Sequence, residues 1–408
     1  MLVCISHSLQ SQCNLPNYPQ VLIEEDSALL YSMNKKGIQQ YLQCVIGQTT
    51  KFIQNSEYSF GDIEYYSPTL GAMLVIDNLT MLNINANETV VNFKSNNIEA
   101  HNINILFNFT WAIYKLNQFG TGELNYTGSD FQLNNLSYYQ DPNCEGNLNR
   151  DSGKFIFKPN IFNVSIFGAA PSIKEELVRE IIMICEGIIP DMMGILAFQQ
   201  MFYFDDIQQN YQTYPKYPNI VKDDRFTSIM LDELNQAVFM KSGYTFNLDN
   251  LSDQFIHAQM INALPVTRNN KQVEYTISKA ALDNFLYIFH TYNDSYSNPS
   301  VFSVVEAPTM ELSKNQVTLN LKVKIQDEEA DLKLKGAPKL RTENDLTFLY
   351  FEFELEPEYY EVISWVNEQI KDACYLIKNE VFSLNGFSVV IDADNDCVKI
   401  VGDIAACL

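Results

Sequence analysis

Apolar and polar residues alternate with a period of two along several segments of this chain. Residues 317–325 carry Val, Leu or Ile at every odd position, with Thr, Asn and Lys between them. Residues 103–113 and 351–355 show the same alternation. Because successive side chains of a strand point to opposite faces, each segment predicts a strand with one buried and one exposed face. Glycine is scarce, at 16 of 408 residues, which favours long strands over many tight turns.

Four other segments repeat their apolar residues every three or four positions, the spacing of a helix with an apolar face. They are residues 38–53, 171–196, 282–289 and 362–377. At the start of the second segment, Ser172 and Glu175 fit a capping box, and Pro190 further along predicts a kink. The predicted order of elements therefore occurs twice along the chain: a helix, a run of strands and a second helix.

The first and third predicted helices begin in the same way. Residues 32–42 align with residues 276–286, which stand 244 positions later. Both segments run from a strand end through a polar cap and a lysine into an amphipathic helix. Two generic helix starts can match by coincidence, but the shared order of elements favours a repeat. We therefore predict two homologous halves, each a strand-rich unit bracketed by two helices.

The composition narrows the class of function. Apolar residues make up 46% of the chain, while 27 Lys and Arg against 50 Asp and Glu give a net charge of −23. So acidic a chain lacks the basic surface that binding to nucleic acid or a polybasic membrane anchor requires. The four histidines leave little capacity for general-base catalysis, and no nucleophile elbow is present. We expect no enzyme, no catalytic residues, no metal site and no cofactor.

Cysteines and glycosylation triplets indicate the secretory pathway. The eight cysteines are scattered and form no CxxC pair, so sparse disulfides are expected rather than a zinc or redox site. No apolar run reaches the roughly 18 residues of a membrane-spanning helix. Residues 1–23 form a separate segment, either the remnant of a signal peptide or the result of a misplaced start. We predict a secreted or lumenal glycoprotein with eight candidate acceptors: Asn78, Asn87, Asn108, Asn125, Asn135, Asn163, Asn250 and Asn293.

The second helical segment is apolar over much of its circumference. Residues 181–184 read Ile-Ile-Met-Ile, and another Ile pair follows at 188–189. A helix that is apolar on two sides must bury both sides. One interpretation is a helix enclosed in a single core. The other is a helix whose second face lines an elongated apolar cavity for lipid tails.

Several short segments carry a resemblance to a known family. Residues 33–38 form a strand-to-helix entry with a Lys-Gly step, and Cys144 and Cys185 stand 41 positions apart. Residues 238–244 and 273–278 follow, one before and one after a linker. In their order and spacing these segments resemble the bactericidal/permeability-increasing and lipopolysaccharide-binding protein family, within the tubular lipid-binding superfamily. The resemblance runs from about residue 24 to residue 404.

The resemblance implies a fold of class α+β with two tandem elongated antiparallel barrels. Each barrel would wrap a long helix, and a central β-sheet would join the two in a boomerang shape. The N-terminal lipid-binding domain would be 24–246, including part of the central sheet, with a linker at 247–270 and a C-terminal lipid-binding domain at 271–408. The family's one characteristic disulfide would pair Cys144 with Cys185 and pin the second helix to its sheet.

The resemblance also implies a ligand, a phospholipid or similar amphiphile whose tails lie between helix and sheet. Each buried CH₂ is worth ~0.8 kcal/mol, so tails can be held without any catalytic group. The protein would bind lipids and could transfer them between membranes or particles. The expected lining residues are Ile38, Leu42, Val45, Ile46, Leu177, Ile181, Ile184, Ile188, Leu282, Phe285, Phe289, Val362, Val366 and Ile370.

The far end of the first barrel departs from the family. Members that capture lipopolysaccharide carry a tip rich in Lys and Arg there, whereas Lys115 is the only cation in the matching turns of this chain. Aromatic residues Tyr58, Phe119 and Phe167 occupy these turns instead, as candidates for contact with a membrane surface or for packing back on the barrel end. Lipopolysaccharide is therefore not an expected ligand, and neutral or zwitterionic lipids are. No oligomeric state is predicted.

Two alternatives stay open at the level of sequence. The same fold could serve as a structural or adhesion module of a glycoprotein that transfers no lipid. Separately, residues 392–396 carry Asp at alternate positions, as a calcium loop does, but Cys397 stands where such a loop has its glycine. Apolar alternation on both sides favours an acidic hairpin turn at this place.

Overall fold

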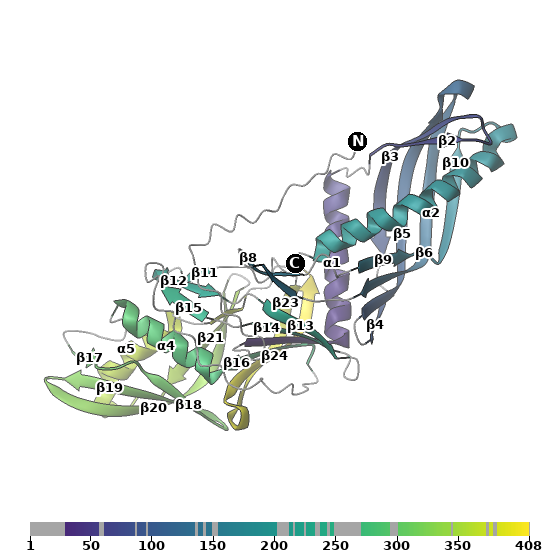
Figure 1. Cartoon of the computed structure of the whole chain (residues 1–408). Coiled ribbons are helices and arrows are strands. Elements are labelled where there is room, and N and C mark those ends of the chain that lie inside the picture. The colour runs from purple at the N-terminus through teal and green to yellow at the C-terminus, as the bar shows by residue number, and fades with distance from the viewer. Residues whose placement is uncertain are drawn as a thin grey trace.

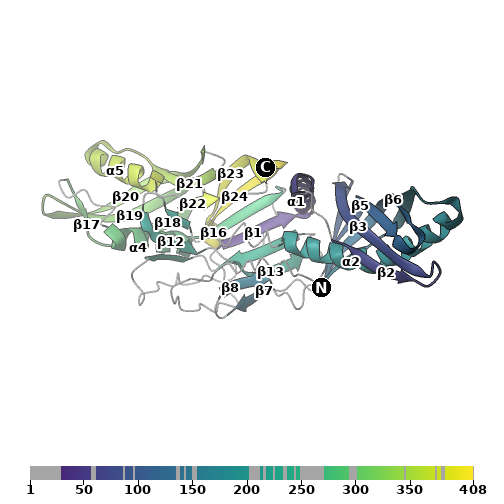
Figure 2. The same ribbon diagram turned by 90° about the horizontal axis from the view of Figure 1, so that it is seen from above.

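The chain forms a long molecule rich in β-sheet with few helices, as the computed structural model shows (Figures 1 and 2). The residues that the structure describes are 29–56, 61–85, 88–94, 97–134, 138–141, 144–148, 154–201, 212–214, 217–223, 226–232, 237–242, 245–248, 271–293, 301–343, 346–372, 375–377 and 382–407. Within these ranges, three large antiparallel sheets follow one another along the molecule. The predicted combination of antiparallel sheets and long helices is confirmed, and two closed barrels stay a prediction.

The N-terminal sheet curls around one long helix. Its strands run in the order β10–β6–β5–β3–β2, with β4 paired to β5 and β9 paired to β6. The strand bounds are β2 Ile63–Ser67, β3 Ala72–Asn85, β4 Val90–Lys94, β5 Asn97–Ile113, β6 Gln118–Asn134, β9 Lys154–Lys158 and β10 Ile161–Phe167. Helix α2, Pro171–Met201, crosses the inner face of this sheet and continues through Pro190 (Figure 1). The odd-numbered side chains of β5 from 103 to 113 are buried on that inner face, as the alternation predicts.

The central sheet brings strands from both halves of the chain together. Its order is β13–β14–β1–β16–β24–β23. The bounds are β1 Leu29–Asn34, β13 Phe226–Asp232, β14 Ala237–Ser242, β16 Val273–Ser278, β23 Phe382–Asp392 and β24 Cys397–Cys407. The two middle strands, β1 and β16, each continue into a helix, α1 (Lys35–Ser56) and α4 (Lys279–Asn293). The hairpin β13–β14 flanks β1, and the hairpin β23–β24 flanks β16. Each half of the chain therefore contributes one middle strand and one hairpin to the sheet.

Residues 244 positions apart occupy matching places in this sheet. Tyr31 of β1 faces Tyr275 of β16, and their ring centroids are 4.7 Å apart. At the start of α1 the Gly37 N–H donates to the Asn34 side chain at 2.9 Å. At the start of α4 the Ala281 N–H donates to the Ser278 hydroxyl at 3.2 Å. The same helix-capping bond therefore recurs at the positions that the sequence alignment equates.

Gly37 differs from its counterpart Ala281 because of a close backbone approach. A Cβ atom at Gly37 would lie 2.4 Å from the carbonyl oxygen of Gln272, the residue that precedes β16. Gln272 also accepts a backbone hydrogen bond from Asn34 at 3.1 Å. The Lys-Gly step of the sequence therefore marks the place where the chain entering the second half crosses the start of α1.

The C-terminal sheet has the order β17–β19–β20–β21–β22, with β18 paired to β19. The bounds are β17 Ser303–Val304, β18 Thr309–Ser313, β19 Gln316–Ile325, β20 Glu328–Glu343, β21 Leu346–Phe353 and β22 Tyr375–Ile377. Helix α5, Tyr360–Asp372, packs beside β21. The predicted fourth helix was too long, because residues 375–377 form strand β22, which pairs with β21. The alternation in 351–355 likewise extends past the strand, since β21 ends at Phe353 and Leu355 is 52% exposed.

Two smaller sheets complete the described part. Strands β11 Gln212–Tyr214, β12 Tyr217–Asp223 and β15 Thr245–Leu248 form one, and β7 Tyr138–Asp141 with β8 Cys144–Leu148 forms the other. The start of the predicted linker is thus strand β15, which lies beside helix α4. Residues 1–23, and 249–270 of that linker, lie outside the described residues.

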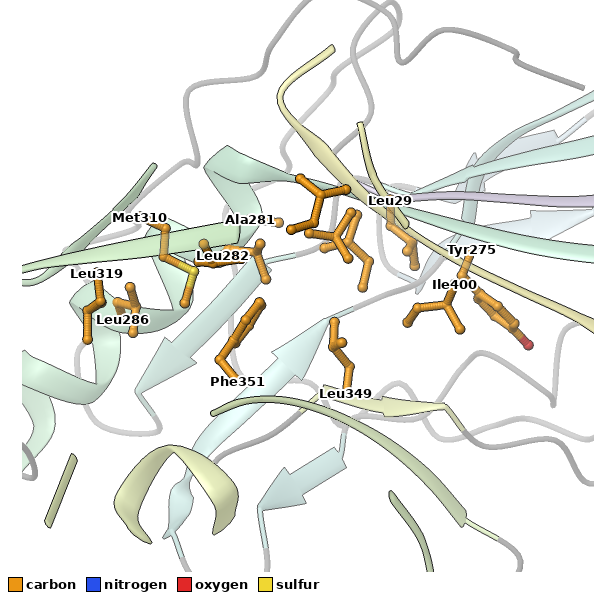
Figure 3. Packing of buried hydrophobic residues seen from close by; sticks show 14 of the residues in the cluster. Leu29, Tyr275, Ala281, Leu282, Leu286, Met310, Leu319, Leu349, Phe351 and Ile400 are labelled. Atoms are coloured by element: carbon orange, nitrogen blue, oxygen red, sulfur yellow. The ribbon is translucent and has the colours of Figure 1, made fainter. Parts of the chain in front are cut away.

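The buried apolar side chains form two cores. One lies between α2 and the N-terminal sheet. The other runs from the central sheet into the C-terminal sheet. Leu29 and Ile400 lie at its central-sheet end, and Leu282 and Phe351 lie toward the C-terminal sheet (Figure 3). Leu42 of α1 packs against both cores, so the first helix connects them.

The cysteines do not pair as predicted. A disulfide joins Cys44 of α1 to Cys407 at the end of β24, with 4.9 Å between the Cα atoms and 363 residues between the positions. Cys185, expected to pair with Cys144, is a free and buried thiol. The predicted Cys144–Cys185 disulfide is therefore wrong for this structure, because the Cys185 side chain packs into the N-terminal core.

Candidate functional site

Helix α2 buries one apolar side against the inner face of the N-terminal sheet. Leu177 and Ile181 are 0% exposed and Ile184 is 5% exposed. They share a core with strand residues such as Phe107. Three of the predicted lining residues therefore lie between helix and sheet, and a fourth, Ile188, is partly buried at the margin of the same core.

The margin of this core is apolar but only partly covered. The two edge strands of the curled sheet, β2 and β10, contribute half-buried apolar side chains, and α2 contributes others. We call these residues the α2 seam: Ile63, Tyr65, Phe162, Val164, Ile173, Val178 and Ile188. The sequence interpretation missed the strand residues, because two short edge strands carry too few alternating positions to stand out. Apolar surface continuous with the core thus reaches the outside of the protein along α2.

Aromatic rings pack beside the middle of α2. Tyr126 stacks on Phe162 with ring centroids 5.1 Å apart and meets Phe157 edge-to-face at 5.4 Å. The Tyr126 hydroxyl donates to the backbone carbonyl of Cys185 at 3.5 Å. Burial raises the pKa of the Cys185 thiol to about 12, so this group stays protonated and unreactive at neutral pH. Packing, rather than the disulfide that was expected, holds this part of the helix.

One carboxylate is buried beside the seam. Glu180 of α2 is 5% exposed, and the Ser67 hydroxyl at the end of β2 donates to its Oε1 at 2.7 Å. The Thr69 hydroxyl donates to the same oxygen. The second oxygen, Oε2, is buried and has no hydrogen-bond partner. Since buried polar atoms are normally paired, this oxygen is an acceptor for which the described residues supply no donor.

The first helix, α1, faces the central core more than the N-terminal one. Ile38 is 3% exposed and packs in the central core with Tyr41. Leu42 is half-buried between the two cores. The side chains of Val45 and Ile46, the other two predicted lining residues of this helix, lie outside the described residues.

The C-terminal half repeats the arrangement of helix against sheet. Leu282 of α4 and Val362 and Val366 of α5 are 0–5% exposed and belong to the same core. Phe302 meets Trp365 edge-to-face at 5.4 Å beside them. The side chains of Phe285, Phe289 and Ile370 lie outside the described residues. Three of the predicted lining residues thus belong to one core together with Phe351 and Leu349 of the sheet. Figure 3 shows Leu282 above Phe351.

The turn between β5 and β6 lies at the end of the N-terminal sheet farthest from the central sheet (Figure 1). Aromatic side chains in and near this turn are exposed. Phe119 is 70% exposed and Phe167 is 55% exposed, on neighbouring strands. Tyr114, 73% exposed, and Leu116, 39% exposed, lie in the turn between β5 and β6 and were not predicted. We call these four residues the aromatic tip. Tyr58, the third predicted tip residue, lies outside the described residues.

Two glycines hold the backbone of the tip tightly. A Cβ atom at Gly120 would lie 2.0 Å from the carbonyl oxygen of Phe167, and one at Gly168 would lie 2.9 Å from that of Phe119. The Lys115 ammonium donates to the carbonyl oxygen of Gly71 in the next turn at 2.8 Å. The exposed rings therefore project from turns that are packed on one another, and the one cation of these turns is already bound to backbone.

The acidic segment after β23 is a hairpin turn, as the flanking alternation predicted. Residues Ala393–Asn395 form one turn of 3₁₀ helix, and Asp396 follows in a left-handed conformation before β24. Asp392 accepts hydrogen bonds from Lys399 at 2.6 Å and from Asn395 at 2.9 Å. Burial works to raise the pKa of Asp392, but these bonds outweigh it and lower that pKa below its usual range. The Asp392 carboxylate thus stabilises the hairpin turn.

No cluster of three or more His, Cys, Asp or Glu side chains suited to a metal ion occurs among the described residues. Within the same ranges, every helix is too short or too polar to cross a membrane.

Comparison with known proteins shows a similarity of fold and does not assign a family. No model of a known protein family matches the chain, and no curated protein is similar to it in sequence. Among solved structures, a crystal structure of lipopolysaccharide binding protein superposes over 93% of this chain and 99% of that chain. The TM-score is 0.53 and the sequence identity is 10%. The similarity therefore supports a distant relationship of fold along nearly the whole chain, as the sequence resemblance implied.

Proposed function

We propose that this protein is a secreted lipid-binding protein that holds phospholipid-like amphiphiles between its helices and sheets and transfers them between membranes or particles. The observation that carries the proposal is the α2 seam, an apolar margin left half-covered along a helix that is buried inside a curled sheet. The likeness of fold to a lipopolysaccharide binding protein supports the same class of ligand. The disulfide between Cys44 and Cys407 supports an oxidising compartment such as the secretory pathway.

The binding energy would come from burial of the tails. Each CH₂ group removed from water contributes ~0.8 kcal/mol, so a tail of about ten carbons offers roughly 8 kcal/mol before the cost of ordering it. Tails entering along the seam would displace no charged group, because the seam side chains are apolar. Extraction of a lipid from a membrane is then feasible without chemistry.

The head of the ligand would meet Glu180. Its Oε2, which has no partner among the described residues, would accept a hydrogen bond from a hydroxyl or ammonium group. A head group with such a donor would gain a charge-assisted bond in a poorly hydrated place. This supports a ligand with a neutral or zwitterionic head over one with bare phosphates.

Contact with the donor or acceptor membrane would use the aromatic tip. Aromatic side chains are enriched at the interface between lipid and water. Lys115 is the only cation in the turns 68–71, 114–117 and 168–170, and it is bound to Gly71. Because a phosphorylated lipid A head needs several Lys or Arg, the tip suits neutral or zwitterionic surfaces and does not suit lipopolysaccharide.

The two halves would each bind one ligand. The capping bonds at Asn34 and Ser278, and the facing of Tyr31 and Tyr275, support an origin of the halves as a repeat. In a repeat, α4 and α5 with the C-terminal sheet would form the second of two tandem barrels. The stoichiometry of bound lipid, two per chain, tests this part of the proposal.

A second candidate function is a structural or adhesion module that binds no lipid. One observation favours it: Leu177 and Ile181 are completely buried, so at these positions side chains already fill the space between α2 and its sheet. The two functions differ in what the purified protein contains.

Extraction of native protein decides between them. The protein is purified from the medium of secreting cells, and an organic extract is analysed by mass spectrometry. Lipid binding predicts near-stoichiometric phospholipid or similar amphiphile, and a clean extract from folded protein would favour the structural module.

Paired variants on α2 test the seam itself. Ile188→Gln places an amide in the seam and should lower the lipid content several-fold. Met183→Gln is the control, because Met183 is 49% exposed on the same helix outside the seam and the change should leave the lipid content unaltered. Equal loss in both variants would show that helix stability, and not the seam, governs lipid retention.

A further inference from the structure

Four glycosylation triplets lie close together on the outer face of the N-terminal sheet. They begin at Asn78 of β3, Asn108 of β5, Asn125 of β6 and Asn163 of β10, and all four asparagines are exposed. These strands are neighbours in the order β10–β6–β5–β3. One triplet therefore stands on each of four adjacent strands.

The strand register makes these asparagines a continuous row. Asn163 lies directly opposite Asn125, and Asn125 lies opposite Leu106, two residues before Asn108. Directly opposed side chains are about 5 Å apart and diagonal ones about 7–8 Å. At the other end of the row, the Asn78 side chain lies 3.4 Å from the Thr110 hydroxyl, next to Asn108. The row crosses the whole width of four strands.

Each triplet is oriented outward by the pleat of its strand. The middle residues Leu79, Phe109 and Tyr126 are 0–3% exposed on the inner face, and Val164 is half-buried there. The asparagine and the hydroxyl residue on either side of them must then point outward. Modification of the asparagines would leave the core and helix α2 untouched.

The outer face around this row consists mostly of Asn, Thr and Ser, with a few carboxylates. Among the outward residues 77, 78, 80, 106, 108, 110, 121, 123, 125, 127, 163 and 165, the charged side chains are Asp77, which lies opposite Thr110, and Glu123. Partial burial raises the pKa of the Asp77 carboxyl, and Glu64 of the neighbouring edge strand β2 lies close enough to contribute to this rise. The chain as a whole has a net charge of −23. Exposed sheet faces normally depend on interspersed charges for solubility. A face built mostly of Asn, Thr and Ser, and poorer in charge than the chain as a whole, fits a surface that is covered and hydrated by sugar.

We infer that this outer face is an N-glycosylated surface whose acceptors are the side-chain amides of Asn78, Asn108, Asn125 and Asn163. The donor is an oligosaccharide linked to a polyisoprenoid diphosphate. The bond from the sugar C1 to the diphosphate oxygen breaks, a bond from C1 to Nδ2 forms, Nδ2 loses one proton, and the lipid diphosphate leaves. The sugars cover the face opposite α2 and leave the α2 seam and the aromatic tip free. This inference does not depend on lipid binding.

The test uses the full chain directed through the secretory pathway of a eukaryotic cell. The secreted protein is treated with peptide N-glycosidase in ¹⁸O-labelled water, and peptides are mapped by mass spectrometry. The inference expects labelled Asp at all four positions. Unlabelled Asn at these positions in secreted, folded protein would overturn it.

Matched variants on one strand separate the triplet from general effects on the face. Thr127→Ala removes the triplet of Asn125 and should lower the mass of the protein by one glycan, whereas Thr127→Ser should keep it. Thr121→Ala, on the same outward face of β6 but in no triplet, should leave the mass of attached sugar unchanged. Loss of a glycan in Thr121→Ala, or its retention in Thr127→Ala, would contradict the assignment.

Discussion

The bond between Cys44 and Cys407 should account for a large part of the stability of this protein. It closes a loop spanning 363 residues, from helix α1 in the first half to the last strand of the second half. Loop-closure entropy for this length amounts to about 6 kcal/mol at most, and native disulfides removed from proteins commonly cost about 2–5 kcal/mol. We expect the double variant Cys44→Ala/Cys407→Ser to lose about 2–5 kcal/mol of unfolding free energy.

Urea denaturation with and without a reductant measures this loss. Each single variant should cost as much as the double variant, because either change breaks the same bond. In the presence of the reductant, the wild type and the double variant should unfold at the same midpoint. Cys185→Ala is the control: it truncates a buried free thiol, so its smaller cost should be the same with and without the reductant. Single-variant costs that add up, or a midpoint unmoved by the double variant, would refute the reasoning.

Three further changes have expected outcomes. Gly37→Ala should destabilise the protein by about 1–3 kcal/mol, because its Cβ would meet a backbone carbonyl. Gly47→Ala, which has open space around it in the same helix, should stabilise the protein by about 0.5–1 kcal/mol, and thermal unfolding compares the two variants. The pKa of Asp392 is lowered in the folded protein, so its ionised carboxylate contributes to the free energy of unfolding above the unfolded pKa, and this contribution is lost as the pH falls through the folded pKa. Asp392→Asn should therefore destabilise the protein at pH 7 and have no effect in strong acid, as measured by urea midpoints across pH. The double variant Phe119→Ser/Phe167→Ser should bind phosphatidylcholine vesicles at least about tenfold more weakly in a flotation assay, with its unfolding midpoint unchanged, since each ring in contact with lipid is worth about 1.5–3 kcal/mol.

Much of the fold could be predicted from patterns within short segments of the sequence. The alternation in 103–113 and 317–325 reflects which face of each strand is exposed to solvent, and this pattern does not depend on which strand is its partner. The capping residues Asn34 and Ser278 mark the starts of α1 and α4 through bonds that span three residues. The end of the fourth helix was placed wrongly because Tyr375–Ile377 joins strand β21, and pairing with a distant strand outweighs a helical spacing.

The candidate site depended on contacts that no short segment contains. Buried residues of α2 were recognised from their spacing, since one apolar helix face is a local property. The strand residues of the seam, such as Ile63 and Phe162, became visible only when the curled sheet brought β2 and β10 beside α2. The tip gained Tyr114 and Leu116 in the same way, because only the packed turns show which side chains are left exposed.

By itself, the sequence determined the periodicity of the strands, the helix starts, the acidic charge and the triplets at Asn125 and Asn163, because each of these resides in neighbouring residues. The tertiary structure decided which cysteines pair and which triplets share a face. Cys44 and Cys407 meet at 4.9 Å between Cα atoms although 363 residues separate them, and strand register places Asn125 opposite Asn163. Proximity between distant residues is set by how whole sheets and helices pack, and a linear pattern contains no measure of it.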